Sequence, residues 1–189
     1  MMGTQTGRWN QGNHNLFMGY YAGHGSSANA MSPGSENVAL GSSALQSFIS
    51  ASQNVAVGKH ALLNNYNGSN NVAVGYESGW YATGSNNTFV GSDAGKGGTT
   101  SAPFSSGGSN TAIGYEALKG FTTGYLNTAV GYRALYAATT AYQNIAVGDN
   151  AMRYLTTGTF NVSIGNNSGP NAMGSRIVAI GELAGRMNK

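Results

Sequence analysis

The stretch "NNVAVGYESGW" (Asn70–Trp80) returns in nearly the same form as "NTAVGYRALYA" (Asn127–Ala137). Each copy has an asparagine, an alternating apolar segment and then a glycine. Aligning the chain on this glycine gives spacings of 22, 17, 17, 16, 23, 17, 17, 17 and 16 residues. The aligned residues are Gly19, Gly41, Gly58, Gly75, Gly91, Gly114, Gly131, Gly148, Gly165 and Gly181. The chain is therefore a tandem repeat with a basic period of 17 residues.

The repeated phrase has the alternation of a β-strand. Val72 and Val74 flank Ala73, and a period of two places the valines on one face and the alanine on the other. We expect the valines to fill the core and the alanine to allow close approach of another surface. Between the phrases, segments such as "ALKGFTTGYLN" (117–127) contain glycine, threonine and aromatic residues. They predict tight turns and a second short strand in each unit.

A unit of this size cannot bury its own apolar face, so equivalent strands are expected to stack in parallel, ~4.8 Å apart. The predicted fold is all-β, a parallel β-solenoid of about ten 17-residue coils over residues 15–185. Insertions fall near 23–36 and 95–109, a segment of residues 1–14 precedes the first coil, and residues 186–189 form a tail. The thin interior and the small alanine face predict a homo-oligomer, and three chains around one axis are the natural closure.

An asparagine stands four residues before the glycine in every copy except the last, where Ile177 replaces it. The asparagines are Asn15, Asn37, Asn54, Asn71, Asn87, Asn110, Asn127, Asn144 and Asn161. Stacked amides can donate and accept hydrogen bonds along a solenoid or satisfy backbone groups at a turn, so we interpret them as structural. The glycine is expected to supply a positive φ or a close backbone approach at a corner.

The composition argues against several classes of protein. Charged residues make up only 8% of the chain, and the net charge of +3 is not gathered into a basic run, so we expect no nucleic-acid partner. There are no cysteines, which excludes disulfides and thiolate metal sites. Because apolar runs are short and the amino terminus lacks a basic start with a following apolar segment, we expect neither a secretory signal nor membrane insertion.

The repeated phrase resembles a known family of repeats. In "NVAVGYESG", "NTAIGYEAL" and "NTAVGYRAL" the asparagine, alanine and glycine are followed by a small residue at a fixed offset, over roughly residues 15–185. This pattern is similar to the head repeat of YadA-like trimeric autotransporter adhesins, and closest to the longer version found in bacteriophage tail fibres. The resemblance implies a left-handed β-roll, three chains per fibre, and a role in presenting a binding surface.

Three acidic residues share one column of the repeat. Glu77, Asp93 and Glu116 each follow a glycine by two positions, so they are expected to stack on consecutive coils. Such spacing is compatible with glycoside cleavage or with a hard cation, but a polar row on a solvated face explains it without either. Because His14, His24 and His60 share no ligand spacing, we predict no enzyme activity, no metal and no cofactor.

Aromatic side chains are the strongest candidates for binding. Amphipathic rings on a rigid, weakly charged surface suit the stacking faces of sugars, although packing between subunits or over coil corners is an equal alternative. The candidate receptor-binding residues are Tyr76, Trp80, Tyr81, Tyr115, Tyr132, Tyr136 and Tyr142. The two insertions are candidates as well, because loops on a stiff scaffold often carry recognition.

We therefore expect a virion fibre protein of a bacteriophage, either a tail fibre or a head fibre. It would act as a homotrimer that attaches to polysaccharide or lipopolysaccharide on the host surface, and residues 1–14 would dock onto another virion protein. The first alternative is a fragment of a bacterial trimeric surface adhesin. An ice-binding solenoid, suggested by Thr88, Thr111 and Thr128, and an enzyme of the tailspike type are further alternatives.

Overall fold

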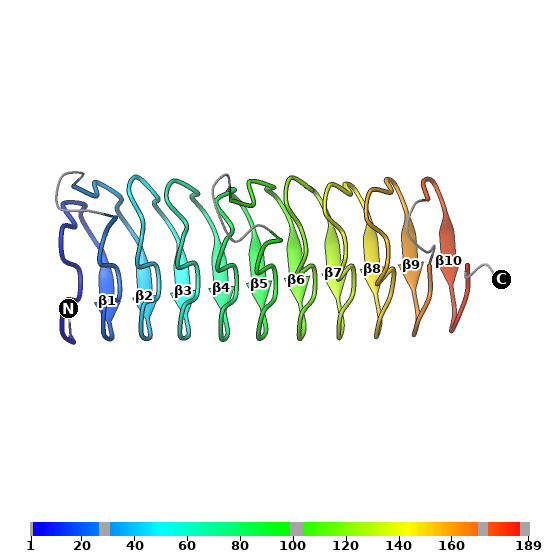
Figure 1. Cartoon of the computed structure of the whole chain (residues 1–189), viewed down its shortest axis with the longest axis horizontal. Helices are drawn as coiled ribbons and strands as arrows, with labels where there is room; N and C mark the ends of the chain where they lie inside the picture. Colours follow the sequence, from blue (N-terminus) through cyan, green and yellow to red (C-terminus); the bar gives the residue numbers. More distant parts are fainter. Residues whose placement is uncertain (1, 27–30, 99–103, 170–173, 186–189) are drawn as a thin grey trace.

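The fold is a single parallel β-sheet wound into a β-solenoid (Figure 1). The computed structural model describes residues 2–26, 31–98, 104–169 and 174–185, so the tail at 186–189 and the middle of each insertion lie outside it. Ten strands follow one another in chain order across the sheet. They are β1 (Leu16–Met18), β2 (Val38–Leu40), β3 (Val55–Val57), β4 (Val72–Val74), β5 (Thr88–Val90), β6 (Thr111–Ile113), β7 (Thr128–Val130), β8 (Ile145–Val147), β9 (Val162–Ile164) and β10 (Val178–Ile180). The predicted all-β parallel solenoid is confirmed.

The strands pair in register, so each coil lies directly on the next. Ala56 of β3 pairs with Ala73 of β4, and Ala73 pairs with Phe89 of β5. Backbone hydrogen bonds also join the turns, as in Leu118 N–H to Ala134 O at 2.9 Å. Equivalent positions of the repeat therefore form straight rows along the solenoid.

The second strand that we predicted in each unit is wrong as a regular element. In the described part of the chain each coil has one three-residue strand, and the rest of the coil contributes only isolated parallel bridges, such as Ala82 with Ser105 and Tyr142 with Thr159. The backbone turns too often there to stay extended. Leu62 and Asn70 in one coil have φ values of 50° and 60°, in the left-handed region. Each such residue costs about 1 kcal/mol, which hydrogen bonds between coils and burial offset.

The two faces of the strand are the reverse of our prediction. Ala73 is fully buried inside the coil, whereas Val72 and Val74 are 36% and 37% exposed on the outside. The coil is narrow, so its interior accepts a small side chain at the centre of the strand together with larger ones from the turns, such as Leu62 and Phe48. The β-branched residues before and after the alanine then point away from the chain's own core.

The interior is packed by exchanging volume between neighbouring coils. Where Phe89 replaces the strand alanine, the position four residues after the corner is glycine in the preceding coil (Gly79) and in the coil of Phe89 itself (Gly95), instead of leucine as at Leu62 and Leu118. A Cβ on Gly79 would lie 2.9 Å from Phe89 Cδ2, and one on Gly95 would also clash with this ring. The large ring is therefore accommodated by two missing side chains.

The asparagines form the predicted structural ladder. Asn54 Oδ1 accepts the backbone N–H of Asn71 at 2.9 Å, and Asn54 Nδ2 donates to Gly68 O at 3.0 Å. Bonds of these two kinds recur along the sheet as far as Asn161. The ladder ends at Ile177, whose N–H donates to Asn161 Oδ1 at 3.0 Å but whose side chain has no amide. Each buried amide thus satisfies backbone groups of the following coil.

The corner glycines also behave as predicted. Gly91 has φ 131°, and a Cβ built on it would lie 2.6 Å from Gly114 O in the next coil. Both a positive φ and a close backbone approach therefore require glycine at this corner.

Residues 2–14, which we expected to precede the first coil, wind into one more turn of the solenoid. Gly3 has φ 123°, like the corner glycines, and Met2 forms a parallel bridge with Met18. Gly7 N–H donates to Ala22 O and Gln11 N–H donates to Ser32 O, each at 2.9 Å. The described part of the solenoid therefore includes these residues from Met2 on, while docking to a virion protein stays a prediction.

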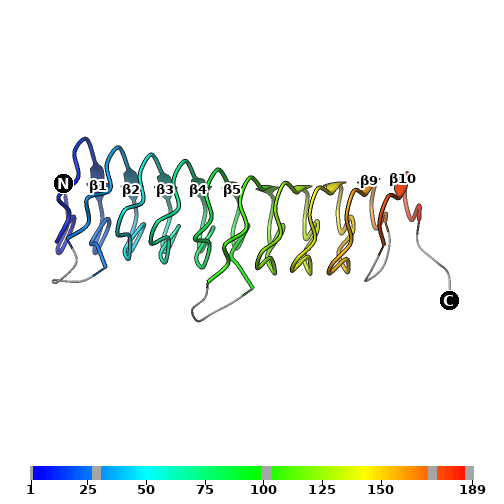
Figure 2. The same ribbon diagram turned by 90° about the horizontal axis from the view of Figure 1, so that it is seen from above.

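The strands line one long side of the molecule (Figure 2). The described parts of the second insertion, 95–98 and 104–109, extend from the opposite side. Hydrogen bonds continue on both sides of this insertion, from Gly98 N–H to Phe121 O at 2.7 Å and from Ser105 N–H to Tyr81 O at 3.0 Å. The insertion therefore leaves the stacking of the coils intact.

Candidate functional site

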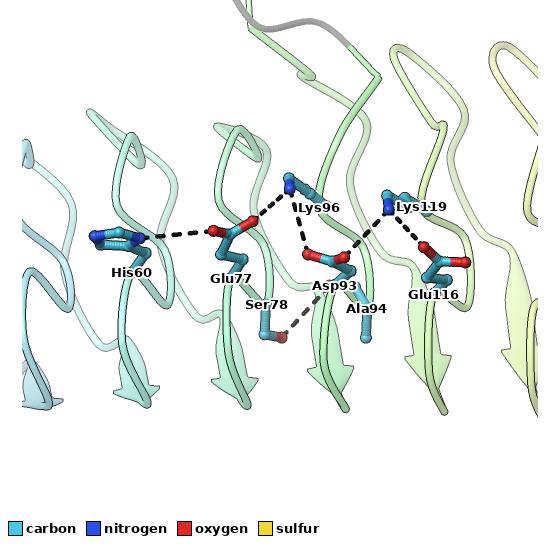
Figure 3. A network of polar contacts seen from close by, with 8 residues as sticks. All are labelled: His60, Glu77, Ser78, Asp93, Ala94, Lys96, Glu116 and Lys119. Atoms are coloured by element: carbon cyan, nitrogen blue, oxygen red, sulfur yellow. Dashed lines mark hydrogen bonds and ion pairs between the residues drawn. The ribbon is translucent and has the colours of Figure 1, made fainter.

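The three predicted acids do stack, and lysines lie between them (Figure 3). Lys96 contacts Glu77 and lies 3.3 Å from Asp93 Oδ1. Lys119 lies 3.1 Å from Asp93 Oδ2 and 2.6 Å from Glu116 Oε1. Each lysine thus bridges acids of two successive coils.

His60 and Arg133 extend this row of polar contacts at its two ends. His60 Nδ1 lies 3.8 Å from Glu77 Oε1, and Arg133 Nε donates to Glu116 Oε2 at 2.5 Å. We call the seven residues the ionic row: His60, Glu77, Asp93, Lys96, Glu116, Lys119 and Arg133. Its ion pairs link five successive coils.

Two carboxylates of the ionic row, Glu77 and Glu116, are held in the charged form. Burial by itself raises the pKa of Glu77, but hydrogen bonds from Lys96 and Tyr76 and the nearby charges outweigh it, and the pKa is lowered. Glu116 behaves in the same way, with burial opposed by hydrogen bonds from Lys119 and Arg133. A general acid for glycoside cleavage needs a raised pKa, so these environments favour a structural role.

The gaps between the acids are filled by ammonium groups of the chain itself. Within the described ranges, no group of three or more histidine or acidic side chains is arranged to bind a metal ion. The acids alone suggested a cation, but the sequence also placed Lys96 and Lys119 three residues after Asp93 and Glu116. That spacing, read together with the stacking of coils, was the signal that sequence reasoning missed.

Three of the candidate tyrosines, Tyr76, Tyr115 and Tyr132, directly follow corner glycines and are 48%, 43% and 42% exposed. The rings of Tyr115 and Tyr132 are stacked at 5.4 Å with an interplanar angle of 13°. Stacking along the solenoid covers one face of each of these two rings. Their outer faces, edges and hydroxyl groups remain for a ligand, so no sugar can stack between the two rings.

Trp80 and Tyr81 belong to a second aromatic stack, together with Phe104 from the second insertion. The rings of Trp80 and Tyr81 lie 5.2 Å apart, and those of Tyr81 and Phe104 lie 5.9 Å apart, each pair with an interplanar angle of 10°. Lys96 Nζ is 5.1 Å from the centre of the Trp80 ring. This stack fixes the base of the insertion, and Phe104 was not among the predicted site residues.

The last two candidates lie apart from that stack. Tyr136 is next to Arg133 and Arg153, whose Cζ atoms lie 5.6 and 5.9 Å from its ring centre. Tyr142 stacks on Tyr125 at 4.9 Å, with an interplanar angle of 1°. The seven candidates are therefore brought together as separate groups along the solenoid and do not form one pocket.

The most extended surface feature was not among the predicted sites. The residues that flank the centre of every strand form two outward rows of mostly β-branched side chains, which we call the outer sheet face. Ile113, Ile145 and Ile164 on it are 41–43% exposed. With ten strands at ~4.8 Å spacing, the face is about 43 Å long. An apolar surface of this length is typical of an interface between proteins.

Comparison with protein family models, with curated proteins and with solved structures gives no match to this chain. Over the part of the chain that the structure covers, no helix is long and apolar enough to cross a membrane.

Proposed function

We propose that this protein is a structural fibre protein of a bacteriophage virion, in a tail fibre or a head fibre, and that it works as a parallel homotrimer. The outer sheet face carries the proposal. The face consists mainly of valine, isoleucine, leucine and methionine, with Thr88, Thr111 and Thr128 in one of its two rows. A closed ring of identical chains would bury this mostly apolar face in every subunit. This face replaces the alanine face, which lies inside the coil.

The rest of the proposal draws on the likeness of the repeat to YadA-like heads and phage fibres. That likeness supports left-handed winding and a role in attachment to the host surface. The described parts of the second insertion, on the side away from the strands, would be displayed outward once the outer sheet face is buried (Figure 2). Weak contacts to polysaccharide or lipopolysaccharide suffice, because three copies per fibre bind together. The alternative, a bacterial trimeric adhesin head, would use the same trimer.

Light scattering coupled to size exclusion tests the assembly. We expect three times the chain mass of 19.4 kDa, and Val74→Lys should reduce the trimer while the matched exposed control Thr140→Lys does not. A monomer that keeps its fold would overturn the proposal. Such a monomer would leave the outer sheet face exposed to solvent. The ice-binding alternative would then be tested by measuring the thermal hysteresis of freezing.

Attachment is tested separately with immobilised bacterial lipopolysaccharide as the probe. We expect the trimer to bind some chemotypes, and Trp80→Ala or Tyr81→Ala to weaken this binding without changing the mass of the assembly. Retention of full binding by variants of all seven candidate aromatics would exclude them as the attachment site.

A further inference from the structure

Two rows of residues border the outer sheet face, one at each end of the strands. The residues directly before the ladder asparagines, or before Ile177 in the last coil, form the asparagine rim: His14, Glu36, Gln53, Asn70, Asn86, Ser109, Leu126, Gln143, Phe160 and Arg176. The residues directly after the corner glycines form the glycine rim: Tyr20, Ser42, Lys59, Tyr76, Ser92, Tyr115, Tyr132, Asp149, Asn166 and Glu182. The rim residues differ in size, polarity and charge from coil to coil. They can therefore distinguish one alignment of neighbouring chains from another, which the outer sheet face cannot do.

At the level of β7 both rims are apolar or aromatic. Leu126 is 49% exposed on the asparagine rim, although its φ of 56° is unfavourable for a leucine. On the other side of the same strand, Tyr132 is 42% exposed. A large apolar residue at a strained and exposed position indicates that something outside this chain covers it.

At the level of β10 the two rims carry opposite charges. Arg176 lies before the strand and Glu182 after it, and both are exposed. Within the described residues, neither side chain forms an ion pair, unlike the acids of the ionic row. The two are separated by the width of the strand, so they are placed to meet partners on other chains.

We propose that the asparagine rim of one copy docks on the glycine rim of the next, with Leu126 against Tyr132 and Arg176 against Glu182. The occupant of each rim is thus a second copy of this chain, and the inference rests on the proposed trimer. In a ring of parallel chains whose sheets face one axis, opposite rims of neighbours meet at equal height. Apolar then meets apolar at β7, and positive meets negative at β10.

These contacts determine the register of neighbouring chains and whether they run parallel or antiparallel. The outer sheet face alone does not determine either, because its side chains are similar in every coil. Sliding one chain by a coil would place Arg176 beside Asn166 and Leu126 beside Tyr115 or Asp149, so the charge pair would be lost. An antiparallel pair that brings like rims together over their full length would place Arg176 near His14 instead of an acid. The rims therefore act as specificity elements that reject wrong alignments.

Cross-linking distinguishes these arrangements, and the absence of natural cysteines makes it clean. A chain carrying Arg176→Cys and Glu182→Cys is treated with a short bismaleimide after its mass is measured. We expect covalent dimers and trimers in denaturing gels, and no cross-linked species with either single variant. A trimeric mass without this cross-link, or with efficient cross-linking of Arg176→Cys and His14→Cys instead, would overturn the rim contact and leave the trimer standing. A monomeric mass would overturn both proposals.

Charge reversal provides an independent readout. Arg176→Glu should shift the trimer–monomer equilibrium in urea about tenfold toward monomer, because three exposed pairs are lost per ring. Adding Glu182→Arg should restore most of it. Equal destabilisation by the single and double variants would show that the two residues do not face each other.

Discussion

The backbone N–H of Asn71 donates to the side-chain Oδ1 of Asn54 at 2.9 Å, one coil away. Both residues are buried, with 1% and 0% of their surface exposed. The same side chain that helps to start one strand thus accepts the N–H that starts the next. The asparagine ladder therefore connects successive coils. This role explains why nearly every copy of the repeat has an asparagine at this position, although the neighbouring residues differ from copy to copy.

Asn71→Ala should lower the free energy of unfolding by about 2–3 kcal/mol, because it leaves buried backbone groups without partners. Asn87 N–H, bonded to Asn71 Oδ1 at 2.8 Å, and Gly84 O, bonded to Asn71 Nδ2 at 2.9 Å, would both lose their partner. Urea unfolding followed by circular dichroism measures the change. Asn67→Ala, at an exposed position of the preceding turn, is the control, and an equal loss there would argue against the ladder.

Gly91→Ala should prevent stable folding, because its Cβ would lie 2.6 Å from Gly114 O and no flexible side chain can move aside. Gly181→Ala is the matched control. It shares the positive φ, 117°, but no atom of the described residues lies within 4 Å of its Cβ. Soluble yield and thermal midpoint of the two variants separate the cost of the clash from the cost of the φ angle. Similar behaviour of both would mean that coil spacing does not require glycine.

The spacing of the repeat was enough to predict the parallel solenoid, the asparagine ladder and the corner glycines, because each depends on a residue type that recurs at one position. The alternation of residue types could not show which face of the strand lies inside the coil. Val72 and Ala73 alternate equally well with either one inside, and only the width of the coil decides between them. Pairing of Glu77 with Lys96 depends on the stacking of different coils, so it requires the fold first.

The two faces of β4 should respond differently to small changes of volume. Ala73→Val adds two methyl groups to a fully buried position and should destabilise the folded chain by about 1–3 kcal/mol. Val74→Ala, on the exposed side of the same strand, should leave the fold intact and weaken only the assembly. Unfolding curves and light scattering on the same samples measure both effects. If Val74→Ala destabilised the fold and Ala73→Val did not, the valines and not the alanine would lie in the core.

The ionic row should make the protein sensitive to acid. The pKa values of Glu77 and Glu116 are lowered in the folded chain, so the unfolded chain takes up protons more readily and stability falls as pH drops below the ordinary carboxyl value of 4.5. The double variant Glu77→Gln and Glu116→Gln should be less stable at neutral pH, yet lose less on acidification. Glu36→Gln, an exposed carboxylate outside the row, serves as control and should keep the steep dependence. Thermal midpoints measured from pH 7 downward test this, and an unchanged slope in the double variant would mean that other groups cause the loss.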